Sequence, residues 1–144
     1  MNKRKVFSII FLIVWMIFIF YMSSLSATTS ASQSNKIASN LCNLFKGLNQ
    51  NTVNFLIRKC AHFTEYLILG LLCLNMIKSF GLKSFLAIII CILYAISDEL
   101  HQLFVIGRSC ELRDVFIDSL GSVSGIIIYN LIEKRKNAKK NNRN

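Results

Sequence analysis

The sequence predicts an all-α integral membrane protein, a bundle of four transmembrane helices with both termini in the cytoplasm. Hydrophobic residues make up 53% of the 144 positions and charged residues only 17%, whereas soluble domains carry about 25% charged residues. Apolar residues form four runs, each close to the roughly 20 residues that span a bilayer core. A chain of this length is expected to form a single domain, residues 1–144.

The four predicted spans differ in how much polar character they contain. Residues 6–22 follow a basic start and carry no charge, and residues 60–77 contain His62 and Glu65 near their beginning. Residues 85–105 become polar from Ser97 onward, and residues 115–132 hold Asp118 as their one charge. The first run resembles a signal peptide in its basic start, but it is longer than the usual apolar core of about 7–15 residues. We therefore expect it to be retained as a span.

The segment between the first two spans is predicted to lie outside the membrane. Residues 23–57 form this outer loop, which begins rich in Ser, Thr and Asn. Further on, the apolar positions have a helical spacing, which predicts an amphipathic helix over residues 37–48 at the outer interface. These positions are Ile37, Leu41, Leu44, Phe45 and Leu48.

The distribution of Lys and Arg predicts the orientation. The formal net charge is +10, but the basic residues lie at the ends of apolar runs and not along a groove-sized face with aromatics between them, as in a nucleic-acid binder. No nucleic-acid partner is therefore expected. Eleven of the 17 basic residues fall in the N-terminal tail, the loop before residue 85 and the C-terminal tail. Because short basic segments stay in the cytoplasm, both termini are predicted to be inside.

The acidic and histidine residues gather at the opposite, outer end. Residues three or four apart share a helix face, so the polar residues of three spans form three stripes that we expect to meet. The stripes are Arg58, His62, Glu65 and Tyr66; Asp98, His101 and Gln102; and Asp114 and Asp118. Gly70, Gly121 and Gly125 are interpreted as sites of close helix packing.

The same positions carry a family resemblance. RKCAHFTEYLILG, followed by SDELHQLFVIGRSCELRDVFIDSLGSVSG, resembles the motifs of the VanZ-like membrane protein family. The resemblance covers essentially the whole chain. It implies a multi-pass protein of the bacterial plasma membrane that acts at the outer leaflet, with a link to resistance to teicoplanin, a lipoglycopeptide directed at lipid-anchored cell-wall precursors. It implies no particular reaction.

One interpretation of the polar cluster is catalytic. A histidine beside carboxylates suits general acid–base chemistry, with His101 as the first candidate base and Glu65 or Asp98 orienting it. The candidate catalytic residues are His62, Glu65, Asp98, Glu99, His101, Gln102, Asp114 and Asp118. Phosphate of a lipid head group or lipid-linked precursor would be received by basic side chains. The candidate binding residues are Arg58, Lys59, Tyr66 and Arg108.

Other interpretations remain open. Carboxylate and imidazole pairs on adjacent helices also suit a divalent metal, although no residue is assigned as a ligand. Alternatively, the cluster is a hydrogen-bonded network that locks the helices, in a protein that binds a membrane lipid, a partner or a lipoglycopeptide without catalysis. Whether the chain is an enzyme is left undecided, and its oligomeric state is not specified. A transporter is the weakest class, because no span is broken mid-membrane by Gly or Pro.

Overall fold

A computed structural model describes residues 2–44 and 49–142, and these residues form five α-helices and no strand. The helices are α1 (Lys3–Ser23), α2 (Ala27–Leu44), α3 (Gln50–Ser79), α4 (Phe85–Gln102) and α5 (Leu112–Asn141). All except α2 are long and apolar enough to cross a membrane. The predicted all-α class with four spans is thus confirmed, while the orientation of the termini stays a prediction.

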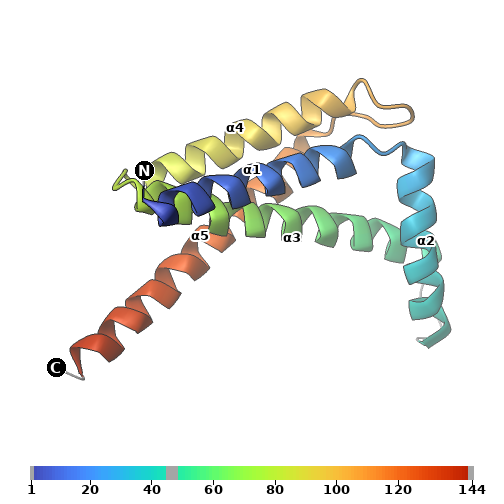
Figure 1. The fold of residues 1–144 in the computed structure, drawn as a ribbon. Helices are drawn as coiled ribbons and strands as arrows, with labels where there is room; N and C mark the ends of the chain where they lie inside the picture. Colours follow the sequence, from blue (N-terminus) through green and yellow to red (C-terminus); the bar gives the residue numbers. More distant parts are fainter. Residues whose placement is uncertain (1, 45–48, 143–144) are drawn as a thin grey trace.

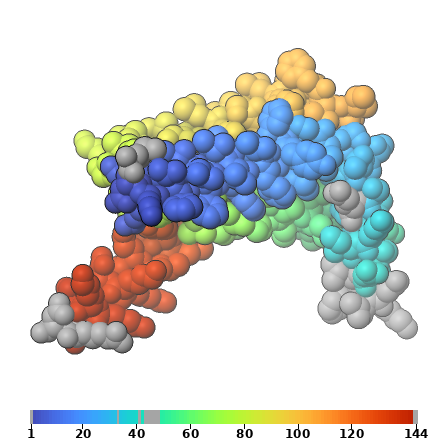
Figure 2. All heavy atoms as spheres, in the orientation of Figure 1, coloured from blue at the N-terminus to red at the C-terminus, as the bar shows by residue number. Residues whose placement is uncertain are grey.

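Helix α3 is the centre of the bundle. It packs against all four other helices, and its contact with α5 is the most extensive. Side chains such as Tyr66, Leu69 and Cys73 are buried between α3 and its neighbours, together with Cys91 of α4 and Ile19 of α1. Large apolar side chains cover the outside of α1, which lies across the front of the bundle in Figure 2. An apolar exterior is expected where lipid, not water, surrounds a helix.

The close approach of α3 and α5 depends on glycine, as predicted. A Cβ atom on Gly121 would lie 2.4 Å from the carbonyl oxygen of Phe63, and one on Gly125 would lie 2.0 Å from that of Leu67. From the other side, a Cβ on Gly70 would lie 2.2 Å from the carbonyl oxygen of Ser122. The two backbones therefore meet without intervening side chains.

Helix ends differ from the predicted span limits. Helix α3 begins at Gln50 and not near residue 60, and α5 extends over residues 112–141 and not 115–132. Both differences have the same cause, because a helix can continue beyond the apolar run that is predicted to cross the bilayer, and the span limits themselves stay a prediction. Helix α4 ends at Gln102, three residues before the predicted limit. There the chain turns through residues 103–111, with Gly107 in the left-handed region at φ 76°.

The predicted outer loop is largely helical. Helix α2 begins at Ala27, ten residues before the expected start of the interfacial helix, and is described as far as Leu44. Its first turn is fixed by the Ala27 amide, which donates to the Ile106 carbonyl, and by the Ser26 hydroxyl, which accepts from the Thr29 amide. Phe45 and Leu48 of the predicted helix lie outside the described residues.

The two ends of the bundle are unlike. Helices α1 and α4 end, and α3 and α5 begin, at the end crossed by α2, which we call the α2 end; both chain termini lie at the other (Figure 1). The termini end carries the basic residues of the N-terminal and C-terminal segments. The Lys78–Glu133 ion pair also lies at this end. The predicted acidic stripes all fall at the α2 end.

Candidate functional site

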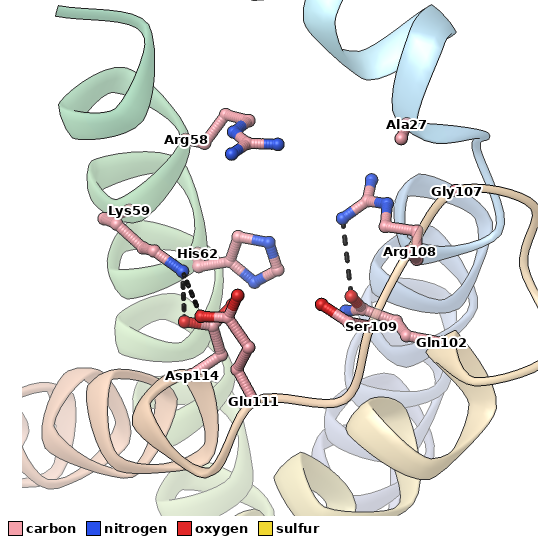
Figure 3. A pocket seen from close by; sticks show the side chains of 10 residues that line it. All are labelled: Ala27, Arg58, Lys59, His62, Gln102, Gly107, Arg108, Ser109, Glu111 and Asp114. Carbon is pink, nitrogen blue, oxygen red and sulfur yellow. Dashed lines mark hydrogen bonds and ion pairs between the residues drawn. The ribbon is translucent and has the colours of Figure 1, made fainter. Parts of the chain in front are cut away.

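A polar pocket of about 170 Å³ opens at the α2 end. Five segments build it: the third and fourth turns of α3, the first turn of α5, the last turn of α4, the loop 103–111 and the start of α2 at Ala27 (Figure 3). Its charged and polar lining comprises Arg58, Lys59, His62, Gln102, Arg108, Ser109, Glu111 and Asp114. The structure therefore brings together residues that are up to 56 positions apart in the sequence, Arg58 and Asp114.

The loop 103–111 holds Arg108 over the pocket. Its guanidinium donates from Nε to the Leu25 carbonyl at 3.2 Å and from Nη1 to Oε1 of Gln102 at 3.5 Å. The left-handed turn at Gly107 immediately precedes it, and a Cβ there would lie only 3.1 Å from Cβ of Ala27. Glycine is thus required for the backbone conformation and for the fit against α2.

Arg58 faces Arg108 from the opposite wall (Figure 3). In the described part of the chain, no hydrogen bond or ion pair joins Arg58 to any other residue. Burial of the Arg108 guanidinium lowers its pKa, and the like charge of Arg58 lowers this pKa further. Two guanidinium groups therefore point into one small space with no carboxylate in contact with either, an arrangement that favours an anion between them.

Lys59 is different, because its charge is already balanced. Its ammonium pairs with Asp114 and lies 3.9 Å from Glu111. Glu111 also pairs with exposed Arg113 at 2.6 Å. The acidic residues on the rim of the pocket are thus neutralised by Lys59 and Arg113, and they leave the charge of Arg58 and Arg108 uncompensated at contact distance.

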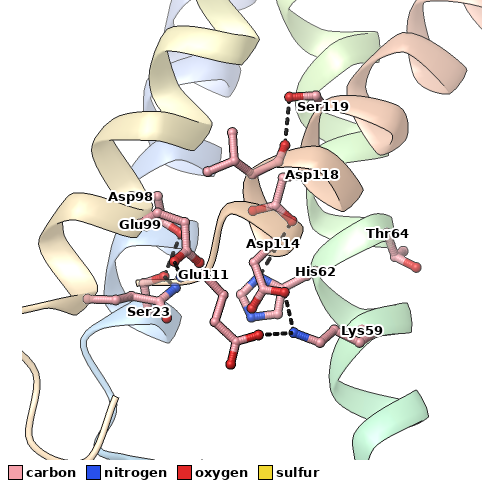
Figure 4. A network of polar contacts seen from close by, with 12 residues as sticks. Ser23, Lys59, His62, Thr64, Asp98, Glu99, Glu111, Asp114, Asp118 and Ser119 are labelled. Atoms are coloured by element: carbon pink, nitrogen blue, oxygen red, sulfur yellow. Dashed lines mark hydrogen bonds and ion pairs between the residues drawn. The ribbon is translucent and has the colours of Figure 1, made fainter. Parts of the chain in front are cut away.

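A layer of three buried carboxylates lies deeper than the pocket lining, and Figure 4 shows these carboxylates near His62, Glu111 and Asp114. Asp98, Glu99 and Asp118 are 3%, 1% and 0% exposed. Asp98 accepts from the Ser23 hydroxyl at 2.7 Å, and Glu99 accepts from the Glu111 amide at 2.9 Å. Among the described residues, one oxygen each of Asp98 and Glu99 and both oxygens of Asp118 have no hydrogen-bond partner. Such oxygens are rare inside proteins and mark a site with capacity for further contacts.

His62 connects the pocket with this layer. It lines the pocket, and its Nδ1 lies 3.6 Å from Oδ1 of Asp118, slightly beyond hydrogen-bond length. Tyr66, one turn along α3, is fully buried and its hydroxyl has no partner in the described residues. The His62 imidazole therefore has a buried carboxylate, Asp118, on one side and shares the pocket with Arg58 and Arg108 on the other.

Six of the twelve predicted site residues do not line the pocket. Four of them are the buried Tyr66, Asp98, Glu99 and Asp118, and the other two are His101 and Glu65. His101 contacts α1, where its Nε2 lies 3.1 Å from the Ser24 hydroxyl and its ring stacks on Phe20 at 4.3 Å. Glu65 lines two adjoining hollows. Of the two histidines, it is thus His62 that faces the pocket.

Several residues that build the site were not predicted from the sequence. Ser23, Leu25 and Ser109 lie in segments with no helical stripe, and Glu111 resembles an ordinary charge at a helix end. Backbone groups such as the Leu25 carbonyl leave no signal in side-chain chemistry. Within residues 2–44 and 49–142, no group of three or more His, Cys, Asp or Glu side chains is placed to hold a metal ion.

Fold and site together define a class: a multi-pass helical membrane protein with four candidate spans and a polar pocket at one end of the bundle. The family model of VanZ/LLP1 matches residues 7–133. The chain therefore belongs to the VanZ/LLP1 family, as its motifs predicted. Neither the curated proteins nor the solved structures compared with it include a match.

Proposed function

We propose that this chain, in the bacterial plasma membrane, binds the phosphate of a lipid-linked cell-envelope component in the pocket at the α2 end. The observation that carries the proposal is the pair of facing guanidiniums, Arg58 and Arg108, which have no contacting carboxylate among the described residues. Guanidinium forms short, charge-assisted and often bidentate hydrogen bonds with phosphate oxygens. A small polar pocket next to apolar helix surfaces fits a head group.

The charge distribution supports an outward-facing pocket. The termini end of the bundle bears the clusters Lys3–Lys5 and Lys134–Lys140. Basic flanking segments favour the cytoplasmic side, and the pocket is at the opposite end. The ligand would then be a lipid of the outer leaflet, a class that includes lipid-linked cell-wall precursors.

A purely structural role accounts for less of the geometry. The contacts of Ser23 with Asp98 and of Lys59 with Asp114 do join neighbouring helices. A network that served only to lock helices would also pair its arginines, since an unpaired charge is costly in this setting. Arg58 makes no such pair, so we favour ligand binding over architecture.

The test measures binding of dihexanoyl phosphatidic acid, a short-chain phosphate lipid, to the purified full chain by calorimetry. Hydrogen bonds to a charged group contribute about 1.5–3 kcal/mol, so Arg58→Gln and Arg108→Gln should each weaken binding about tenfold or more. Arg135→Gln is the matched control, because Arg135 is exposed and lies at the termini end of the bundle, far from the pocket. Equal affinity of all four proteins, or equal affinity of wild type for dihexanoyl phosphatidylcholine, contradicts the proposal.

A second candidate function is acid–base chemistry on the bound lipid, which the position of His62 favours. The imidazole faces the pocket, and buried Asp118 lies 3.6 Å behind it, an order that orients a general base. His62→Gln would then abolish turnover of a phosphate-bearing envelope lipid and leave binding of dihexanoyl phosphatidic acid within a few-fold. Absence of turnover by wild type leaves binding as the function.

A role in teicoplanin resistance is a further candidate, because the family resemblance links such proteins to this resistance and the proposed ligand class includes lipid-linked cell-wall precursors. If the protein withholds or alters a lipid-linked precursor, expression in a susceptible bacterium raises the inhibitory concentration of teicoplanin. Arg58→Gln should remove that increase at equal protein level. An increase that Arg58→Gln leaves intact would separate resistance from the pocket.

A further inference from the structure

A larger, apolar groove runs along the seam between α1 and α3. Its volume is about 390 Å³, and its walls include Trp15 and Phe18 of α1 and Ile57 and Ile68 of α3. The Trp15 ring is fixed, because its Nε1 donates to the Glu65 carbonyl at 2.9 Å. The groove lies between two helices that are candidate membrane spans, so lipid chains are expected next to it.

A third, smaller hollow adjoins both the groove and the polar pocket. Its volume is about 60 Å³, and it shares Arg58 and Arg108 with the pocket. It shares Ala61 and Glu65 with the groove. The smallest side chain at this junction, Ala61, is exposed and so leaves the passage open on the α3 side.

The order of surfaces along this path is that of a lipid molecule. Two guanidiniums lie at one end, a short polar junction follows, and an apolar channel along the helix axes completes the path. An amphipathic ligand with a phosphate head and a hydrocarbon chain matches each part in turn, because charge contacts charge and apolar surface contacts apolar surface. A free phosphate ion would use only the pocket.

We propose that the α1–α3 groove holds one hydrocarbon chain of the same lipid whose phosphate lies between Arg58 and Arg108. The ligand is thus an intact membrane lipid that enters sideways from the bilayer, past Ala61. This inference rests on the proposed head-group function and adds the binding site of the chain.

Trp15 is the single tryptophan of the sequence, and its place on the groove wall makes it a specific reporter. Bromine atoms on a lipid chain quench tryptophan fluorescence on contact. The full chain is placed in phosphatidylcholine nanodiscs that contain brominated-chain phosphatidic acid or brominated-chain phosphatidylcholine. If the groove is specific, brominated phosphatidic acid reaches half-maximal quenching at a mole fraction that is at least about tenfold lower than that of brominated phosphatidylcholine. Arg58→Gln should remove this preference.

Ala61→Phe tests the passage itself. A phenyl ring at the junction should abolish preferential quenching and weaken binding of dihexanoyl phosphatidic acid much less than Arg58→Gln does, because both guanidiniums remain in place. Ile96→Phe, a substitution at a lipid-facing position of α4, is the matched control and should change neither measurement.

The outcomes separate the two proposals. Equal quenching of wild type by both brominated lipids, with short-chain phosphatidic acid still bound through the arginines, means annular lipid only and overturns the groove inference alone. If substitution of Arg58 or Arg108 changes neither the binding of short-chain phosphatidic acid nor the quenching by brominated lipid, both the head-group function and the groove inference are overturned. Preferential quenching that survives Ala61→Phe overturns the entry path past Ala61.

Discussion

Replacement of Gly125 by alanine should destabilise the bundle by forcing α3 and α5 apart. The added Cβ would lie 2.0 Å from the carbonyl oxygen of Leu67, whereas optimal contacts are about 3.5 Å or longer, so one backbone must move by about 1.5 Å. No flexible side-chain end is available to yield, which puts the cost near the upper end of the overpacking range, about 3 kcal/mol. Alanine recovers about 0.5–1 kcal/mol over glycine inside a helix. The free energy of unfolding should therefore fall by about 2 kcal/mol.

The measurement is equilibrium unfolding in mixed micelles, followed by circular dichroism. Ser124→Ala is the matched control, because the Ser124 hydroxyl bonds only to the Leu120 carbonyl of its own helix, and a change of less than about 0.5 kcal/mol is expected. Gly121→Ala should resemble Gly125→Ala and should also weaken binding of dihexanoyl phosphatidic acid, since its Cβ would press on Phe63, next to His62. A Gly125→Ala variant as stable as wild type would refute the reasoning that backbone contact sets this interface.

Three further predictions concern the pocket and its supports. Gly107→Ala and Gly81→Ala both place alanine at positive φ, and each should lower the free energy of unfolding in micelles by about 1–2 kcal/mol. Gly107→Ala alone should also weaken binding of phosphatidic acid, because it moves Arg108. Equal binding by the two variants would contradict this. His101→Ala should leave binding by calorimetry within about twofold, since His101 contacts α1 and not the pocket; a loss as large as that of Arg108→Gln would return His101 to the site. Raising the salt concentration from about 0.1 M to about 1 M, which shortens the Debye length from about 10 Å to about 3 Å, should weaken binding of wild type more than that of Arg58→Gln, and parallel salt dependence would argue against a charge contact.

Helical periodicity predicted which residues meet but not which edge of each helix faces inward. Successive residues are rotated by about 100° around a helix, so Asp98 and Gln102 lie within about 40° of each other and Glu99 lies on one side of them. His101 lies on the opposite side. The structure buries Glu99 against the Glu111 amide of α5 and leaves His101 on α1. The choice between these two edges is made by neighbouring helices, and no pattern within one helix encodes it.

The inward face of α3 was predicted more accurately than that of α4, because α3 has more polar residues at helical spacing. Arg58, His62 and Glu65 were predicted to share a face, and they line the pocket or the hollow beside it. What sequence analysis missed was supplied by backbone, as in the Leu25 carbonyl that accepts from Arg108. A carbonyl is present at every residue, so only the three-dimensional path of the chain reveals which one becomes a partner.

The placement of opposite charges in depth explains why the arginines remain available. Asp98, Glu99 and Asp118 are fully or nearly fully buried. Asp118 lies behind His62, and in the described residues none of the three carboxylates forms an ion pair with Arg58 or Arg108. At contact distance these carboxylates would pair with Arg58 and Arg108 and close the pocket. Ser23 holds Asp98 and the Glu111 amide holds Glu99 one layer deeper, where both carboxylates attract Arg108 without contacting it. In the proposed function, a phosphate would meet an Arg108 guanidinium that is already held by the Leu25 carbonyl and by Gln102, so little rearrangement of that side chain would oppose binding.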